Sequence, residues 1–468
     1  MKNLFFLTFF LLISLATKAE KVVLSGTAKT YAGSTISIMY HTDAFTYTSE
    51  KITDFKVDKT GKYSVEFDID KTQLIYLPLE VYKAFLYVEP GKKYELRLPP
   101  KQELTPAQKL NPFFEADELM IGIANTEPNE LNRIVRTLDD KMDSFINQNF
   151  YKIYRKKEKS AGIQFSEQLK QEFGSMKNEF FTEYFRYRLG FLQFLSNPYS
   201  FLKIENDFFK NQKIQLNNPA YMSLYKKQYG NFFNGYFKQK ESLALSNAYK
   251  AENTYAEIKK LMQKYPAYDN AQLLDMIIAT STFDSFTRKF IGKEKTLSIL
   301  QDVMKASNNN YNKNLCRNFI AKITHLQKNY PAPDFNLGGV QLADFKGKYL
   351  YLNFCNTQSY PCLQDFKEIE KLKQQFGQHI EFLSIVCDWD VKKWLEFSKN
   401  NKYSWKFIPI GDQHQLIHEY KVKAFPSYVL IDPKGNIVKA PAQAPKEYIH
   451  LEFLKIARDA ARKSQKKH

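Results

Sequence analysis

Hydrophobic and polar positions follow different periods along this chain, and the changes between them mark its regions. From Lys21 to about Leu98, short runs such as residues 35–40 and 63–69 alternate apolar with polar side chains, and turn signals such as residues 58–61 separate them. Alternation of this kind is typical of strands that bury one face. We therefore predict an antiparallel, sandwich-like β domain over residues 20–104.

The period becomes helical between residues 105 and 330, where long amphipathic stretches are interrupted at Asn197-Pro198, Asn218-Pro219 and Tyr265-Pro266. Two aromatic stripes repeat at helical spacing in this all-α region, and their members are Phe180, Tyr184, Tyr187, Phe191 and Phe194, then Tyr221, Tyr225, Tyr229, Phe232 and Tyr236. Helical bundles bury area through such stripes, which favours core helices packed ring against ring. An aromatic ligand groove is the alternative.

A third pattern begins after residue 330. Apolar runs at 348–354, 380–386 and 427–431 alternate with helical stretches at about 359–376 and 391–400. Strands that alternate with helices imply βαβ units around a parallel core. The chain is therefore predicted to be multidomain, with a C-terminal α/β domain over 331–454 and a tail over 455–468.

Residues 1–19 are typical of a secretory signal peptide. Lys2 supplies a positive charge, residues 4–15 are mostly apolar, and residues 16–19 include small side chains for cleavage. The apolar run is shorter than the ~20 residues of a membrane-spanning helix, and no later stretch stays apolar for that length. We predict export to the periplasm or cell envelope, with no transmembrane segment after removal of the signal peptide.

Composition and charge narrow the class of partner. The length of 468 residues exceeds the roughly 250–300 residues that one hydrophobic core supports, so more than one domain is expected. The formal net charge of +18 would suggest nucleic acid as the partner of a cytosolic protein, but export argues against that class. Six Lys or Arg residues against one Asp make 455–468 a basic tail. A solvated end is the favoured interpretation, and weak attraction to anionic surfaces is the alternative.

Several short motifs of the third region occur in the order and spacing of a known fold. They are Pro333-Asp-Phe335, Gly347-Lys348, Leu352-Asn-Phe354, Pro361-Cys362 and Phe425-Pro-Ser-Tyr-Val-Leu-Ile-Asp432. On these residues the chain resembles the thioredoxin fold, specifically envelope thiol-disulfide oxidoreductases of the TlpA/ResA type. The resemblance implies a cis peptide bond before Pro426 and a peptide-binding face shared by Tyr360, Pro361, Phe425 and Pro426.

The chemistry implied by this resemblance needs a Cys-x-x-Cys pair at a helix N-terminus, where the first thiolate attacks a disulfide and the second thiol resolves the mixed disulfide. Here Ser359 stands at the attacking position and Cys362 at the resolving one. A hydroxyl is hardly ionised at neutral pH and forms no stable bond to sulfur, so Ser359 cannot begin the exchange. Ser359 also suits a helix N-cap, and Pro361 suits a first turn.

Other thiols leave two enzymatic alternatives open. Cys355 and Cys387 end neighbouring predicted strands, so Cys355 could pair with Cys387 or with Cys362, whereas Cys316 in the helical region is interpreted as a core thiol. Ser359-x-x-Cys362 also fits half of the peroxiredoxin motif, with Cys362 as the peroxidatic thiol. Residues 331–450 contain no Arg that would lower the pKa of that thiol, which argues against a peroxidase.

His414 and His418 have the spacing of two metal ligands on a helix, but no third ligand is near them in the sequence, so we interpret them as surface histidines. No metal or cofactor is expected. The predicted function is a redox-impaired binding or scaffolding module of the cell envelope with a protein or peptide partner. A thiol-disulfide oxidoreductase that uses Cys362 with Cys355 or Cys387 is the first alternative, and a peroxiredoxin-like thiol peroxidase is the second.

Overall fold

The computed structural model describes residues 19–111, 113–156, 159–196, 201–265, 268–388 and 391–465. The predicted signal peptide, except for its last residue, lies outside these ranges, as do Asn197-Pro198 and Pro266. The chain forms two compact units. The first contains residues up to 102 together with 117–315, and the second contains 103–116 together with 316–468.

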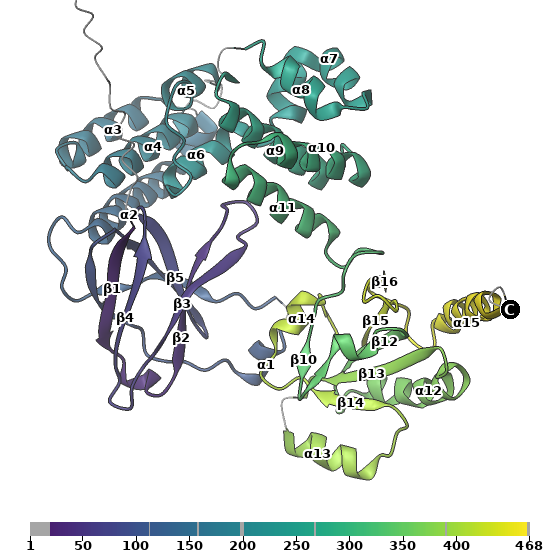
Figure 1. Cartoon of the computed structure of the whole chain (residues 1–468). Helices are drawn as coiled ribbons and strands as arrows, with labels where there is room; N and C mark the ends of the chain where they lie inside the picture. Colours follow the sequence, from purple (N-terminus) through teal and green to yellow (C-terminus); the bar gives the residue numbers. More distant parts are fainter. Residues whose placement is uncertain are drawn as a thin grey trace, which may run out of the picture. The chain divides into compact units, whose positions relative to one another are not determined.

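Two sheets form the β domain of the first unit (Figure 1), one with the strand order β3-β2-β5-β6-β8 and the other with the order β4-β1-β7-β9. The strands are β1 (Glu20–Thr27), β2 (Thr35–His41), β3 (Ser49–Lys56), β4 (Lys62–Ile69), β5 (Gln73–Leu79), β6 (Tyr82–Val88), β7 (Lys93–Arg97), β8 (Asp117–Met120) and β9 (Gly122–Ile123). Alternate side chains of both sheets, such as Leu24 and Ile38, meet in one buried core. The predicted alternation is therefore that of a two-sheet sandwich.

Two features of this domain correct the prediction of an antiparallel domain ending at residue 104. β1 runs parallel to β7, and β6 runs parallel to β8. The chain leaves the first unit after β7, forms the short helix α1 (Pro106–Lys109) as part of the second unit, and returns to complete both sheets with β8 and β9. Strand partners so far apart in sequence leave no local pattern, so periodicity alone could not predict them.

Helices fill the rest of the first unit and continue to the boundary of the second. They are α2 (Leu131–Phe150), η2 (Tyr151–Lys156), α3 (Lys159–Phe173), α4 (Glu179–Ser196), α5 (Phe201–Phe208), α6 (Pro219–Tyr229), η3 (Phe233–Phe237), α7 (Lys238–Lys250), α8 (Thr254–Met262), α9 (Ala271–Thr287), α10 (Lys293–Ala306) and α11 (Asn310–Thr324). The predicted break at Asn218-Pro219 is the start of α6, where the Asn218 side chain accepts hydrogen bonds from two backbone N–H groups. Four members of the second aromatic stripe, Tyr221, Tyr225, Tyr229 and Phe232, are only 1–2% exposed.

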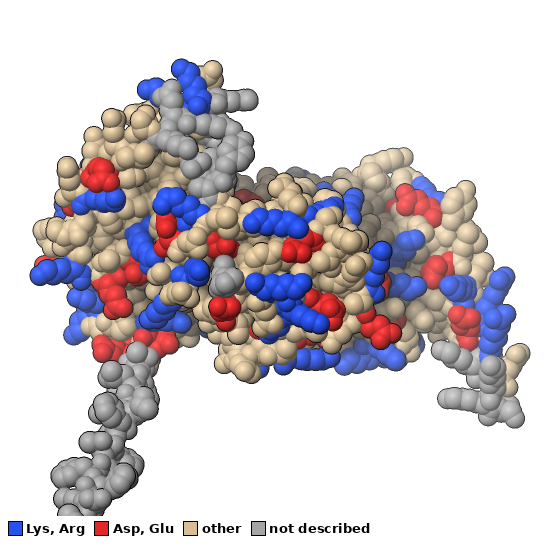
Figure 2. All heavy atoms as spheres, turned by 90° about the horizontal axis from the view of Figure 1, so that it is seen from above, with Lys and Arg blue, Asp and Glu red and all other residues tan. Residues whose placement is uncertain are grey.

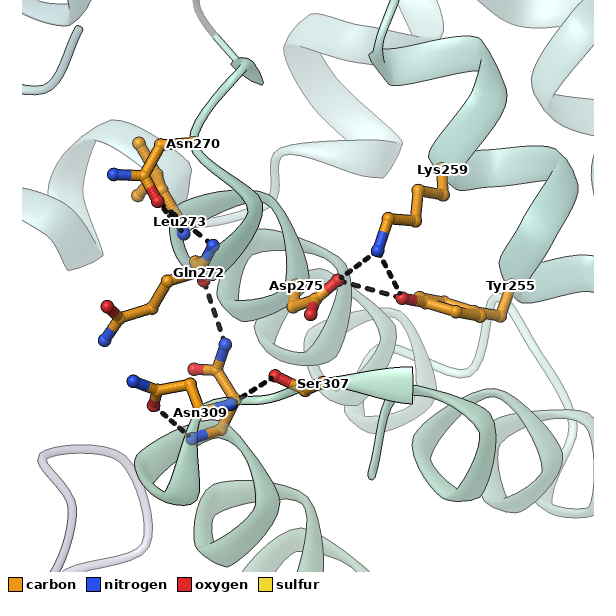
Figure 3. Close-up of polar contacts among 9 residues, drawn as sticks. Tyr255, Lys259, Asn270, Gln272, Leu273, Asp275, Ser307 and Asn309 are labelled. Atoms are coloured by element: carbon orange, nitrogen blue, oxygen red, sulfur yellow. Dashed lines mark hydrogen bonds and ion pairs between the residues drawn. The ribbon is translucent and has the colours of Figure 1, made fainter. Parts of the chain in front are cut away.

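Polar side chains join the helices around the start of α9 (Figure 3). Asn270 caps α9 by accepting from the backbone N–H groups of Gln272 and Leu273. Asp275, one turn further along, accepts hydrogen bonds from Tyr255 at 2.9 Å and from Lys259 at 3.1 Å, both on α8. The α8–α9 contact thus contains a buried carboxylate whose charge is paired.

The C-terminal domain of the second unit has a five-stranded sheet with the order β14-β13-β12-β15-β16. Its elements are the hairpin β10 (Asn336–Leu337) and β11 (Val340–Gln341), then η5 (Leu342–Phe345), β12 (Tyr349–Cys355), α12 (Tyr360–Phe376), β13 (Ile380–Val386), α13 (Val391–Asn400), β14 (Lys406–Pro409), α14 (Gln415–Glu419), β15 (Ser427–Ile431), β16 (Ile437–Lys439) and α15 (Ile449–Gln465). β12, β13 and β14 run parallel, and β15 and β16 are antiparallel additions. The parallel core predicted for this region is confirmed.

The structure adds short strands to this prediction, among them β14 in the central sheet, and it alters the tail. β14 was not predicted, because it has four residues, ends at a proline and lies at the sheet edge. Residues 455–465, predicted as part of a basic tail, belong to α15, which begins at Ile449. Buried Ile449, Phe453 and Ile456 pack this helix against the domain core. Its first turns are therefore part of the fold.

Charge is mixed on the face drawn in Figure 2, where Lys and Arg side chains are spread over the surface with Asp and Glu among them. No helix within the described ranges combines the length and the apolar character needed to cross a bilayer.

Candidate functional site

The N-terminus of α12 follows directly from the central strand β12. Ser359 is the N-cap residue, with extended backbone angles, and Pro361 lies in the first turn. The serine side chain makes no capping hydrogen bond to the helix backbone, so the N-cap role predicted for Ser359 holds for position only. The next residue, Tyr360, is 71% exposed. An exposed aromatic ring and a half-buried hydroxyl therefore stand at the start of the helix.

Cys362 lies one turn into α12 and is fully buried. Burial raises the pKa of its thiol, and the nearby carboxyl groups of Asp365 and Asp388 raise it further. Hydrogen bonds from the Asn356 backbone, at 3.4 Å to Sγ, and from the Ser359 side chain act in the opposite direction without outweighing burial. The thiol form of Cys362 is therefore favoured at neutral pH.

Cys355 and Cys387 are also buried free thiols, at the ends of β12 and β13. The backbone N–H of Cys387 donates to the Cys355 carbonyl at 2.7 Å, so the two strand ends are adjacent, as predicted. Their side chains, however, belong to different cores: Cys387 packs on the α14 side of the sheet, and Cys355 packs with Cys362 on the α12 side. This arrangement argues against a Cys355–Cys387 disulfide and leaves Cys355 and Cys362 as neighbours in one core.

The Phe425–Pro426 peptide bond is cis, which confirms the prediction for Pro426. Phe425 is half-buried and contacts both cores of the domain. Two residues after the proline, Tyr428 donates a hydrogen bond to Asp365 of α12 at 2.8 Å. Burial raises the pKa of the Asp365 carboxyl, although the Tyr428 hydrogen bond opposes this shift. Sequence reasoning missed Asp365, whose only signal was a carboxylate on the inner face of α12, one turn after Cys362.

A second polar link joins the loops that follow β12 and β13. The Asp388 carboxylate accepts a hydrogen bond from the Thr357 backbone at 2.7 Å and another from the Thr357 hydroxyl. A cavity of about 250 Å³ lies beside this link, at the carboxyl ends of β13 and β14, and its wall includes Trp394, Ile410 and Leu110, the residue after α1. The returning segment 103–116 therefore contributes to the surface of this domain.

The remaining candidates do not join the site. Cys316 is fully buried in α11, which agrees with its interpretation as a core thiol. His414 is the residue before α14, and His418 lies in its last turn. No group of three or more His, Cys, Asp or Glu side chains suited to a metal occurs within the described ranges.

Comparisons with known proteins agree with this geometry. A family model described as thioredoxin-like matches residues 347–437. The chain is 27% identical to the thioredoxin-like protein YneN of Bacillus subtilis over 132 residues, which are 26% of this chain and 76% of YneN. It is 30% identical to the thiol-disulfide oxidoreductase ResA of Geobacillus thermodenitrificans over 151 residues, which are 30% of this chain and 84% of ResA.

Among solved structures, the thioredoxin domain of a thiol-disulfide oxidoreductase from Bacteroides vulgatus is 22% identical, with a TM-score of 0.25, and the match covers 27% of this chain and 96% of that one. The residues that the family model matches contain β12, α12, β13 and β15, which form the core of the α/β domain. Through this C-terminal domain, the chain belongs to the thioredoxin-like family of ResA-type thiol-disulfide oxidoreductases.

Proposed function

We propose that the C-terminal domain is a redox-impaired thioredoxin-like module that binds a protein or peptide partner in the cell envelope. The observation that carries the proposal is the start of α12, where a serine N-cap is followed by a buried thiol whose pKa is raised. Thiol-disulfide exchange begins with an accessible thiolate. Ser359 has no thiol, and Cys362 is neither exposed nor inclined to ionise, so neither residue meets this requirement.

The surface around the start of α12 has aromatic and proline side chains that could contact a protein or peptide partner. Tyr360 projects into solvent, Pro361 is exposed, and Pro426 and Phe425 are half-buried in the neighbouring loop. Aromatic and proline side chains bury apolar area at a small cost in conformational entropy, since they have few rotatable bonds. An extended segment of a partner protein suits such a face because its backbone can pair with exposed loop backbone while its side chains contact the rings.

The predicted signal peptide supports a location in the envelope, and the basic residues of α15, including Lys455 and Arg458, allow weak, salt-sensitive association with anionic surfaces. The partner class follows from the location, since an exported chain meets proteins, peptides and cell-wall polymers before it meets nucleic acid.

Two assays test the proposal. Insulin reduction by the mature protein is expected to stay at the uncatalysed rate, and turnover that disappears in Cys362→Ala would contradict it. A photo-crosslinking amino acid at position 360 is expected to capture an envelope protein, whereas the same amino acid at Lys367, exposed two turns further along α12, is not. Equal capture at both positions would show that the face is not a specific surface.

An oxidoreductase that uses Cys355 and Cys362 is the second candidate, because both sulfur atoms lie in the core on the α12 side of the sheet. Counting free thiols in the unfolded protein before and after mild oxidation distinguishes the two. Four thiols in both samples support the binding module, and a reversible loss of two supports the oxidoreductase. A peroxidase is disfavoured, because the neighbours that shift the pKa of Cys362 by charge are carboxyl groups, which oppose a thiolate.

A further inference from the structure

A small cavity in the helical region combines buried polar groups with aromatic walls. It has a volume of about 170 Å³, and its lining residues belong to α5, to the η3–α7 junction and to the segments after α5 and α8. Pockets for drug-sized ligands occupy roughly 300–1,000 Å³, so this cavity suits a smaller molecule. It belongs entirely to the first unit. Its use is therefore independent of the function proposed for the C-terminal domain.

Glu205 of α5 provides a buried carboxyl group in the cavity wall. The residue is 4% exposed, and burial raises the pKa of its carboxyl, although hydrogen bonds from Tyr268 and Tyr229 and the charges of Lys240 and Lys210 oppose this shift. The Tyr229 hydroxyl lies 3.5 Å from Oε1. A carboxylate has about four acceptor positions, so two tyrosine donors leave capacity for a ligand.

Tyr236, the last member of the second aromatic stripe, supplies an unused polar group. Its hydroxyl is buried and has no hydrogen-bond partner within the described ranges. Its ring is held between two neighbours, since it stacks on Phe201 with 3.6 Å between centroids and has the Lys240 ammonium 4.8 Å from its centroid. A buried hydroxyl without a partner destabilises a fold unless something else satisfies it.

Two lysines give the cavity a positive side. Lys210 and Lys240 both line it, and neither forms an ion pair within the described ranges. Lysine ammonium groups bind carboxylate and phosphate oxygens through charge-assisted hydrogen bonds. The same cavity thus presents cationic donors at Lys210 and Lys240, an acceptor at Glu205 and a hydroxyl at Tyr236.

We propose that this cavity binds an acidic monosaccharide, with its carboxylate or phosphate on Lys210 and Lys240 and its hydroxyl groups on Glu205 and Tyr236. The C–H groups of a sugar ring pack against aromatic rings, and Tyr265 and Tyr268 supply two such rings to the cavity wall. A hexose with one acidic group combines an anion, several hydroxyls and an apolar face in a molecule of monosaccharide size. A uronic acid and a sugar phosphate share this chemistry.

Saturation-transfer NMR on the mature protein, with glucuronate, glucose 6-phosphate and glucose as separate probes, tests the proposal. Saturation transfer is expected for at least one acidic sugar, with glucose binding at least about tenfold more weakly because it lacks the anion. Transfer to glucuronate alone identifies a uronic acid site, and transfer to the phosphate alone identifies a sugar phosphate site. No transfer to either acidic sugar, or equal binding of glucose, would overturn the proposal.

Variants distinguish a built site from general adsorption. Lys240→Met is expected to weaken binding by about tenfold, since it removes one charge-assisted contact. The matched control is Lys238→Met on the same helix, whose ammonium lies 6.0 Å from the Phe290 ring, and it is expected to bind as the parent does. Tyr236→Phe is expected to weaken binding while leaving the melting temperature unchanged or higher. Unaltered binding in both Lys240→Met and Tyr236→Phe would also overturn the assignment.

Discussion

The Asp388 carboxylate accepts hydrogen bonds from both the backbone and the hydroxyl of Thr357, and so it joins the loop before α12 to the loop after β13. Thr357 is only 6% exposed. The segment that leads into Ser359 is therefore held from the side by a charged acceptor. The position of the helix start depends on this link as well as on β12.

Thr357→Val tests the link, because it removes the hydroxyl donor and keeps the shape of the side chain. We expect the free energy of unfolding to fall by about 1–3 kcal/mol, since a charged acceptor in a partly buried place loses one of its donors. Urea denaturation measures the change. Thr357→Ser retains a hydroxyl and is expected to lose less. A loss of stability in Thr357→Ser without a loss in Thr357→Val would assign the effect to packing of the methyl group.

Ser359→Cys is expected to restore the missing thiol at the start of α12. The new side chain would stand one turn before Cys362, where the helix N-terminus lowers the pKa of a thiol. We expect a reversible disulfide with Cys362 and insulin reduction above the uncatalysed rate. Mass spectrometry under oxidising and reducing conditions detects the bond, and Ser359→Cys combined with Cys362→Ala serves as the control. A folded variant that forms no such bond would show that the two positions are wrongly paired.

Stability is expected to fall at alkaline pH because burial raises the pKa of both Cys355 and Cys362 in the folded protein. The folded state keeps these protons above the ordinary thiol pKa of about 8.5, whereas the unfolded chain releases them. This contribution to the free energy of unfolding is complete below the pKa of the unfolded thiol. As the pH rises above that value, the contribution falls by up to about 1.4 kcal/mol per thiol for each pH unit. Urea denaturation at pH 7.5 and 9.5 measures the loss. The double variant Cys355→Ala and Cys362→Ala should show a smaller pH dependence, and an unchanged dependence would point to other groups.

Lys259→Met is expected to destabilise the helical region more than Asp275→Asn. Replacement of Lys259 by methionine removes the positive charge beside the Asp275 carboxylate, whose side chain is 4% exposed. Of the three residues in this contact, only Tyr255 then still donates a hydrogen bond to that carboxylate. We expect a loss of about 1–3 kcal/mol, below that of a fully buried pair because the lysine side chain is 25% exposed. Asp275→Asn keeps an oxygen that can accept from Tyr255. Thermal unfolding of both single variants and the double variant measures the coupling, and strictly additive losses would argue against a direct interaction.

Apolar runs and turn residues in the sequence were sufficient to locate several individual strands and helix ends. Apolar runs located β12, β13 and β15, and the Asn218-Pro219 pair located the start of α6. Pairing between distant strands was not accessible in this way. The parallel alignment of β1 with β7 depends on the core that both sheets share, and no residue in either strand signals it.

The sequence likewise predicted only part of the candidate site. Motif spacing placed Ser359 and Cys362 at the start of a helix and Pro426 in the opposing loop, and the cis bond before Pro426 agrees. The relation between Cys355 and Cys387 required strand register, because a shift of one residue exchanges the two faces of a sheet. Thr357 and Asp388 were missed for a similar reason. They are 31 residues apart in sequence and meet because two parallel strands end at the same edge.

Residues 103–116 have a consequence for the order in which this chain can fold. They emerge from the ribosome before every other residue of the second unit. Residues 117–315, some two hundred residues of the first unit, separate them from Cys316, where the second unit resumes. Leu110 must remain without its final neighbours until β13 and β14 exist. The β sandwich can restrain both ends of the segment in the meantime, because β7 precedes it and β8 follows it in separate sheets. A gene fragment that begins after residue 330 therefore encodes a C-terminal domain without α1, and its exposed apolar surface would favour aggregation.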